Sequence, residues 1–105
     1  MIKGIGCDIV DIDRIKLKIS DKILCEEELL KFNDSKNKEQ FLASRFAAKE
    51  AIIKATNKKY LFKDIIISND KYGAPTTNIE GIKITISHEK NIAIAFAIWE
   101  EDVQH

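Results

Sequence analysis

The longest helical pattern in this chain is residues 38–56, KEQFLASRFAAKEAIIKAT. Apolar side chains recur there at helical spacing, alanines fill many of the positions between them, and neither glycine nor proline interrupts the run. We therefore expect one long helix, which ends at the polar residues 57–59. Most of the remaining chain is expected to form a sheet on which this helix packs.

Residues 2–10 precede the helix and alternate with a period of two, which predicts a first strand. One face of that strand would carry Ile5, Cys7 and Ile9, and the other would carry Gly4, Gly6, Asp8 and Val10. Glycine inside a strand often marks a position that a ligand or another backbone approaches closely. Two short helices are expected next, one capped by Asp11 and one at about residues 26–32.

A period of two returns after the long helix. It predicts strands at residues 64–68, 74–77, 82–88 and 92–99, separated by turns. The last of these is apolar on both faces, so we expect it at the centre of a sheet or at an interface. The order of strand, helices and meander indicates an α+β fold, with one long helix packed on an antiparallel sheet, in a single domain of residues 1–105.

Charge and hydropathy exclude several classes of partner. The chain has 105 residues with 17 basic and 17 acidic side chains, which argues against a nucleic-acid binder or a polybasic membrane binder. No apolar run is long enough to span a membrane. Two cysteines in a chain with no recognisable signal peptide indicate a reducing, cytoplasmic compartment. The cysteines lack CxxC spacing and a nearby histidine, which argues against a zinc site or a thiol nucleophile. Gln104 and His105 are expected to form a frayed end. The charge is uneven, however, because residues 36–63 carry eight basic and only two acidic residues.

Glu50 is the first candidate for chemistry. Four-residue spacing places it on one helix face with Phe46 and Lys54. Arg45 and Lys49 form the neighbouring row, so the Glu50 carboxylate would lie in a cationic setting. The alternative is a solvated helix face with ordinary ion pairs between residues four apart.

Asp8 is the second candidate, because strands disfavour aspartate and Gly6 precedes it by two residues. The alternative is a strand-end residue whose carboxylate caps the following turn. If Asp8 and Glu50 come together, the two carboxylates suit Mg²⁺, which keeps several waters and binds substrate phosphates. His88, at the end of the strand predicted at 82–88, is either a core residue or a contact to a phosphate or nucleotide.

Three segments resemble one known family. They are residues 4–10 (GIGCDIV), 45–55 (RFAAKEAIIKA) and 86–90 (ISHEK), and their order and spacing extend the resemblance over essentially the whole chain. The family is that of the bacterial holo-[acyl-carrier-protein] synthases, within the 4′-phosphopantetheinyl transferase superfamily. The middle segment is the most specific, since an aromatic residue precedes Lys-Glu-Ala and a further lysine.

The resemblance implies an enzyme of fatty acid biosynthesis. Such an enzyme transfers 4′-phosphopantetheine from coenzyme A to a serine of apo-acyl carrier protein and releases adenosine 3′,5′-bisphosphate. The resemblance also implies a homotrimer with active sites at the subunit boundaries. Mg²⁺ would polarise the pyrophosphate of coenzyme A. The base that accepts the serine proton stays open between a metal-bound water and a carboxylate acting through water.

The resemblance also implies roles for individual residues. Asp8 and Glu50 match the Mg²⁺ ligands and are catalytic together with Lys54, which would offset the charge on the leaving phosphate. The implied contacts to coenzyme A are Arg45, Phe46, Lys49, Lys54 and His88. The implied contacts to the carrier protein are Arg14, Lys16 and Lys18.

Two departures from the family affect the expected contacts to adenine and the 3′-phosphate. Family members usually have a glycine-containing loop after the helix, where this chain has residues 56–60, TNKKY. They also usually carry a longer polar or basic residue where this chain has Ala74. Lys58 or Lys59 is the candidate replacement for the missing contacts.

A function of a different class is a non-catalytic binding module. It would use the cationic residues 36–63 to hold an anionic partner, such as a nucleotide or an acidic protein. A purely structural protein is the third alternative, and it would leave Asp8 beside Gly6 unexplained.

Overall fold

The computed structural model describes residues 1–101, so the fraying expected at Gln104 and His105 lies outside the described residues. The strands are β1 (Ile2–Asp11), β2 (Ile67–Asn69), β3 (Pro75–Thr77), β4 (Ile82–Glu89) and β5 (Ile92–Glu100). The helices are α1 (Ser20–Ile23), α2 (Glu26–Asp34) and α3 (Lys38–Thr56), and 3₁₀ turns lie at Ile12–Arg14, Leu17–Ile19 and Phe62–Asp64. Within this part of the chain, no helix is both long enough and apolar enough to cross a membrane.

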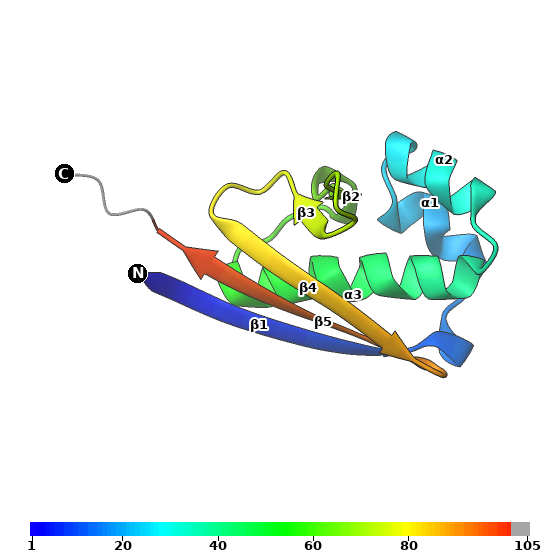
Figure 1. Cartoon of the computed structure of the whole chain (residues 1–105), viewed down its shortest axis with the longest axis horizontal. Coiled ribbons are helices and arrows are strands. Elements are labelled where there is room, and N and C mark those ends of the chain that lie inside the picture. Colours follow the sequence, from blue (N-terminus) through cyan, green and yellow to red (C-terminus); the bar gives the residue numbers. More distant parts are fainter. Residues whose placement is uncertain (102–105) are drawn as a thin grey trace.

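The three long strands form one antiparallel sheet in the order β1-β5-β4. The first strand thus pairs with the last, with Asp8 opposite Ala95 and Ile5 opposite Ile98. Helix α3 lies along one face of this sheet, mainly over β1 and β5 (Figure 1). The predicted α+β architecture and the central position of the last strand are therefore confirmed.

Small residues determine how closely α3 packs on the sheet. The helix and β5 meet through buried alanines, which are Ala47, Ala48, Ala51, Ala93, Ala95 and Ala97. A Cβ atom on Gly6 would overlap the Ala51 carbonyl oxygen, and one on Gly4 would overlap that of Ala55. The two strand glycines therefore allow the backbone of α3 to approach β1. Of the two alternatives given by the sequence, a ligand or another backbone, the structure shows the backbone.

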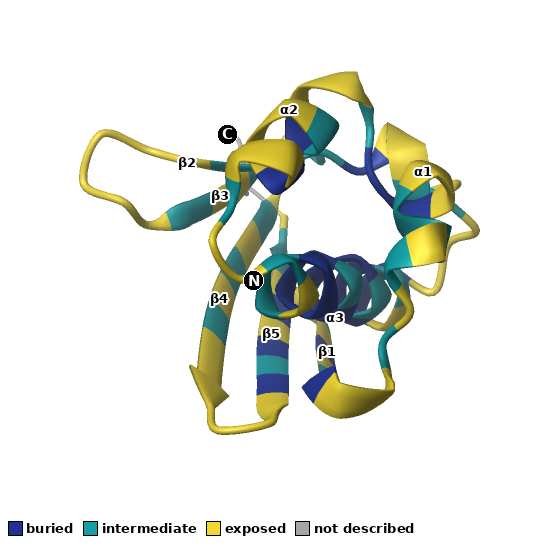
Figure 2. Ribbon diagram, turned by 90° about the vertical axis from the view of Figure 1, so that its right-hand side faces the viewer, coloured by how far each residue is buried: buried dark blue, intermediate teal, exposed yellow. Residues whose placement is uncertain are grey.

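The β2–β3 hairpin stands beside β4 and has an exposed tip (Figure 2). Its first strand begins at Ile67, later than expected, because a 3₁₀ turn occupies residues 62–64. The helix expected after Asp11 is likewise only a 3₁₀ turn. Its predicted cap is correct, since the Asp11 carboxylate accepts a hydrogen bond from the Asp13 amide at 3.0 Å.

The sheet face opposite α3 is apolar and uncovered. Exposed fractions there are 65% for Ile5, 62% for Ile9, 44% for Phe96 and 36% for Ile98. The two apolar faces of β5 thus differ, with alanines under α3 and large side chains on the open face. Apolar patches of this kind on a protein surface usually mark an interaction surface.

Candidate functional site

Asp8, Glu50 and Lys54 meet where α3 passes over β1. Lys54 Nζ donates hydrogen bonds to Asp8 Oδ1 at 3.0 Å and to the Cys7 carbonyl oxygen at 3.1 Å. Glu50 lies one helical turn before Lys54, near enough to Asp8 for the two carboxylates to repel each other. We call these three residues the carboxylate–lysine cluster. The close packing of α3 on Gly6 brings its members together.

The pKa values in this cluster follow from partial burial and from the two like charges. Burial, and then the charge of Asp8, raise the pKa of Glu50, whereas Lys54 opposes that rise. The hydrogen bond to Asp8 and the charge of Asp8 raise the pKa of Lys54. Lys54 therefore holds its proton more firmly than a free lysine, and ionised Glu50 is less stable in the folded protein than a solvated carboxylate would be.

The donor atoms of the cluster fit a hard divalent cation. Mg²⁺ prefers oxygen ligands and usually takes only one or two carboxylates from a protein, with waters and phosphates as its other ligands. Lys54 bonds to Asp8 at 3.0 Å and follows Glu50 by one turn of α3, so both carboxylates belong to the same part of the surface. Within residues 1–101, no group of three or more His, Cys, Asp or Glu side chains is gathered for a metal. A cation here would therefore need further ligands from water or substrate.

An open cleft of about 290 Å³ is the second candidate surface. It lies between α3 and the β2–β3 hairpin, and we call it the hairpin cleft. Arg45, Gln40 and His88 are among the polar residues that line it. His88 is exposed, and its Nε2 lies 3.1 Å from Nε2 of Gln40. The alternative that His88 is a core residue is therefore wrong.

The predicted site residues fall on two flanks of α3. Asp8 belongs to β1 and His88 to β4, and β5 runs between these strands. Arg45 was expected beside Glu50, but its side chain turns to the hairpin cleft, which Asp8 does not line. One protomer therefore does not bring Asp8 and His88 into the same pocket.

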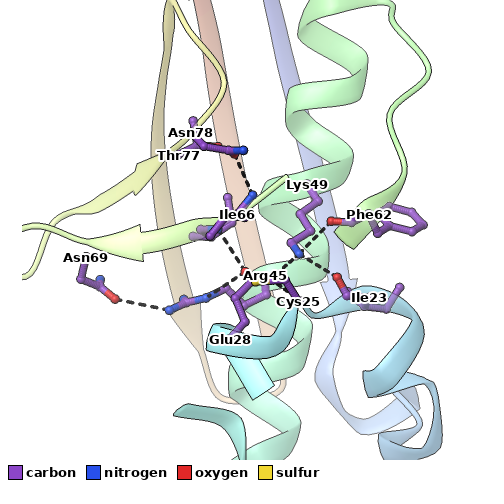
Figure 3. Close-up of polar contacts among 11 residues, drawn as sticks. Ile23, Cys25, Glu28, Arg45, Lys49, Phe62, Ile66, Asn69, Thr77 and Asn78 are labelled. Carbon is purple, nitrogen blue, oxygen red and sulfur yellow. Dashed lines mark hydrogen bonds and ion pairs between the residues drawn. The ribbon is translucent and has the colours of Figure 1, made fainter. Parts of the chain in front are cut away.

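Lys49 is buried, not available to a ligand. It is 0% exposed, and its Nζ donates to Glu28 Oε1 at 2.6 Å. The carbonyl oxygens of Ile23 and Phe62 accept the other two hydrogen bonds, at 2.7 and 2.9 Å (Figure 3). These three acceptors use every hydrogen of the ammonium group. The prediction that Lys49 contacts coenzyme A is therefore wrong.

The remaining predicted residues occupy different surroundings. Phe46 is half-buried, with its ring centroid 5.5 Å from that of Phe62. Arg14, Lys16 and Lys18 are exposed, in the segment that follows β1. Their exposure leaves the predicted contact with a carrier protein sterically open, and that contact stays a prediction.

The loop after α3 shows how this chain manages without the expected glycine. Asn57 caps the helix in the left-handed conformation, with φ of 54°, which glycine usually adopts at such a position. Lys58 lies over the Trp99 ring, 5.1 Å from its centroid. The side chain of Lys58 therefore already has a contact within the protein.

Glu28 is the residue that sequence reasoning missed. It is 2% exposed and pairs with Lys49. A signal was present in α3, where Leu42, Arg45, Lys49 and Ile52 follow the spacing of a buried helix stripe. Two cations in such a stripe require a buried acid, but the sequence does not say which of residues 26–28 provides it.

Comparisons with known proteins agree over nearly the whole chain. A family model described as the 4′-phosphopantetheinyl transferase superfamily matches residues 4–98. A holo-[acyl-carrier-protein] synthase of Oceanobacillus iheyensis is 39% identical over 116 aligned residues, which cover 95% of this chain and 98% of that protein.

Solved structures give the same answer for the fold. A holo-(acyl-carrier-protein) synthase from Bacillus anthracis, in complex with CoA (3′,5′-ADP), matches with a TM-score of 0.91 and 35% identity, and covers 97% of this chain and 99% of that one. The holo-[acyl-carrier-protein] synthase of Neisseria meningitidis matches with a TM-score of 0.88 and 31% identity, over 96% of this chain and 100% of that one.

Proposed function

Since this chain belongs to the 4′-phosphopantetheinyl transferase superfamily, we propose that its reaction takes place at the carboxylate–lysine cluster. Like the holo-[acyl-carrier-protein] synthases, the chain transfers 4′-phosphopantetheine from coenzyme A to a serine of apo-acyl carrier protein and releases adenosine 3′,5′-bisphosphate. The observation that carries the proposed location is the meeting of two carboxylates, Asp8 and Glu50, with the cation of Lys54.

Each residue of the cluster has a chemical part in this reaction. Asp8 and Glu50 would hold Mg²⁺, which supplies polarisation of the coenzyme A pyrophosphate when bound. Lys54 binds phosphate oxygens as a cation and offsets the charge on the leaving adenosine bisphosphate, because its raised pKa keeps it protonated. A Mg²⁺ ion held by Glu50 would lower the pKa that burial and Asp8 raise in the metal-free protein, so the proposed acceptor of the serine proton is a water beside the cluster and not the Glu50 carboxylate itself.

The hairpin cleft is the proposed site for the adenosine end of coenzyme A. Arg45 presents a guanidinium group there, which suits phosphate oxygens. His88 adds an exposed ring that can stack or donate a hydrogen bond. Phe46 stays a proposed contact through the exposed part of its ring, whereas Lys49 is excluded by its burial.

A homotrimer would complete this site. The β1 flank of one protomer carries the carboxylate–lysine cluster, and the opposite flank of its neighbour carries the hairpin cleft. Three head-to-tail contacts of this type close into a ring. The uncovered apolar sheet face, with Ile5 and Phe96 among its residues, supplies a surface for such an assembly.

The carrier protein is proposed to dock on Arg14, Lys16 and Lys18. These exposed cations would attract an acidic carrier protein and orient its serine toward Asp8, six residues before Arg14. We also propose that the enzyme acts in cytoplasmic fatty acid biosynthesis, where a reducing environment would keep Cys7 and Cys25 free.

A mass measurement tests the activity directly. The protein is incubated with apo-acyl carrier protein, coenzyme A and Mg²⁺, and the carrier protein is then weighed by mass spectrometry. The expected result is a gain of one phosphopantetheine that requires all three additions. An unchanged mass would contradict the proposal, and retained binding of coenzyme A in that case would indicate the non-catalytic module instead.

A further inference from the structure

A network of buried polar side chains joins α2, α3 and the start of β2 (Figure 3). Glu28 of α2 lies at its centre and is 2% exposed. Its Oε1 accepts hydrogen bonds from Lys49 Nζ at 2.6 Å and from the Cys25 amide at 3.0 Å. Its Oε2 accepts one from the Ile67 amide at 3.0 Å and lies 3.9 Å from Nε of Arg45. One carboxylate thus contacts two cations of α3 and the backbone of β2.

Arg45 is the cation of this network that reaches the hairpin cleft. Its Nη2 donates to Asn69 Oδ1 at 3.3 Å, and its guanidinium carbon lies 4.4 Å from the centroid of the Phe41 ring. Its Nε is buried without a hydrogen-bond partner among the described residues. Burial lowers the pKa of Arg45, and the charge of Glu28 opposes that change. The carboxylate is therefore what makes a buried guanidinium tolerable at the cleft.

The opposite wall of the cleft is tied to the same carboxylate. Glu28 holds the first residue of β2 through the Ile67 amide. Two residues later, Asn69 meets Arg45, and its Nδ2 donates to the Gly73 carbonyl oxygen at 3.0 Å in the hairpin tip. A continuous series of contacts therefore leads from Glu28 to both walls of the cleft.

We propose that Glu28 is a positioning residue for coenzyme A, which holds Arg45 and the β2–β3 hairpin in the arrangement that binds the adenosine-phosphate end. This inference rests on the proposed function, in which Arg45 contacts the coenzyme. Glu28 is too deeply buried to touch substrate, so its effect passes through Arg45 and through Ile67. Its loss weakens binding of the coenzyme and leaves the chemistry at the carboxylate–lysine cluster unchanged.

Two variants separate positioning from a purely structural role. Glu28→Gln alone would leave two buried cations without an acid, which threatens folding. Lys49→Met removes the ion pair with Glu28 but keeps one acid beside one cation, so Arg45 retains its partner. Combining Glu28→Gln with Lys49→Met removes the same ion pair and also deprives Arg45 of its carboxylate. The difference between the two proteins reports what Glu28 does for Arg45.

The measurement is the affinity of each full-length protein for adenosine 3′,5′-bisphosphate by isothermal titration calorimetry, together with KM for coenzyme A and kcat. We expect Lys49→Met to bind within about twofold of the wild type. The double variant is expected to bind at least about tenfold more weakly, with KM raised to match and kcat within about twofold. Circular dichroism checks that both proteins are folded.

Equal affinities of the two variants would overturn the inference, whether both bind well or both bind weakly. A lowered kcat at unchanged KM would also overturn it, and so would a double variant that does not fold, because Glu28 would then serve folding alone. Failure of the wild-type protein to bind adenosine 3′,5′-bisphosphate would contradict the proposed coenzyme site itself, and the inference with it. Failure of the inference is therefore seen in the two variants, whereas failure of the proposed coenzyme site is seen in the wild-type protein.

Discussion

Asp8 and Glu50 carry like charges, so electrostatic repulsion between the two carboxylates opposes their proximity. Lys54 bonds directly to Asp8, at 3.0 Å, and the pKa of Glu50 rises despite that lysine. Perturbed carboxylates of this kind are typical of functional sites, where a protein gives up stability for activity. One substitution, Glu50→Gln, can therefore test both the role of the carboxylate in activity and its cost in stability.

Glu50→Gln is expected to abolish Mg²⁺-dependent transfer. The amide keeps the shape of the side chain but loses the charged oxygens that a hard cation requires, so activity should fall by more than about a hundredfold. The readout is the mass shift of the carrier protein at saturating Mg²⁺. Glu39→Gln makes the same chemical change in the exposed first turn of α3 and should retain turnover. Undiminished turnover by Glu50→Gln would remove the metal role.

The same variant should be slightly more stable than the wild type at neutral pH without metal. Folding raises the pKa of Glu50, so its protonated form favours the folded state and its ionised form opposes it. The wild type therefore loses stability relative to Glu50→Gln as pH rises from the ordinary glutamate pKa through the raised one. Because solvent screens this half-buried carboxylate, the difference should stay below about 1 kcal/mol.

Urea unfolding with a chelator at neutral pH and at about pH 4 measures this difference. The gap in the free energy of unfolding should be present at neutral pH and should shrink at the lower pH, where the Glu50 carboxylate is largely protonated. A wild type that was the more stable at neutral pH would show that Glu50 is not under electrostatic strain.

The sequence predicted the carboxylate–lysine cluster better than the buried network. Glu50 and Lys54 are four residues apart on one helix, and local spacing therefore fixes their relation. The burial of Lys49 is not predictable in the same way, because spacing alone does not tell which row of charged side chains faces solvent. The residue that decides it, Glu28, lies 21 positions away in the sequence and belongs to another helix.

At the scale of elements, the contact between β1 and α3 depends on Gly6. In Gly6→Ala the new methyl group would overlap the Ala51 carbonyl oxygen. Because that oxygen belongs to the backbone of α3, it cannot move aside without shifting the helix. We expect a loss of about 2–4 kcal/mol in the free energy of unfolding. Chemical denaturation measures it. Gly73→Ala, at a positive φ but with no atoms near, should cost only about 1 kcal/mol.

The segment that follows β1 is expected to control carrier-protein docking. Arg14→Glu should raise KM for the carrier protein and make that KM less dependent on salt. An exposed charge at the edge of an interface acts mainly on the rate of association. KM for coenzyme A should not change. Lys31→Glu, an equal charge change on the exposed side of α2, serves as the control. A changed affinity for coenzyme A would contradict the docking role of Arg14.

Most elements were predictable because their patterns are local. The long helix predicted at residues 38–56 is found at Lys38–Thr56. Its alanine-rich sequence favours a helix along its whole length, and no glycine or proline interrupts it. The predictions for the short strand β2 and for the turns after β1 were less accurate. Their conformation depends on distant partners, such as Asn78, whose side chain accepts a hydrogen bond from the Ile66 amide at 2.8 Å.

At the scale of the whole molecule, the uncovered sheet face is a surface at which the proposed homotrimer can be tested. Phe96→Glu places a charge among Ile5, Ile9 and Ile98, and should dissociate a trimer into protomers with loss of transfer activity. Light scattering measures the mass of the assembly. Tyr72→Glu, at an exposed aromatic residue of the hairpin tip, should leave that mass unchanged. A monomeric wild-type protein would contradict the trimer.

The pairing of β1 with β5 constrains the order in which the chain can fold. Ile2 lies opposite Glu100, and the only strand beside β1 in the described residues is β5, which follows all the other described strands in the sequence. During translation β1 emerges before β5 and stays unpaired, with its glycines and large apolar residues exposed, until β5 has also left the ribosome. Contacts that span so much of a chain form slowly. The nascent protein is therefore exposed to misassociation throughout the synthesis of the residues between β1 and β5.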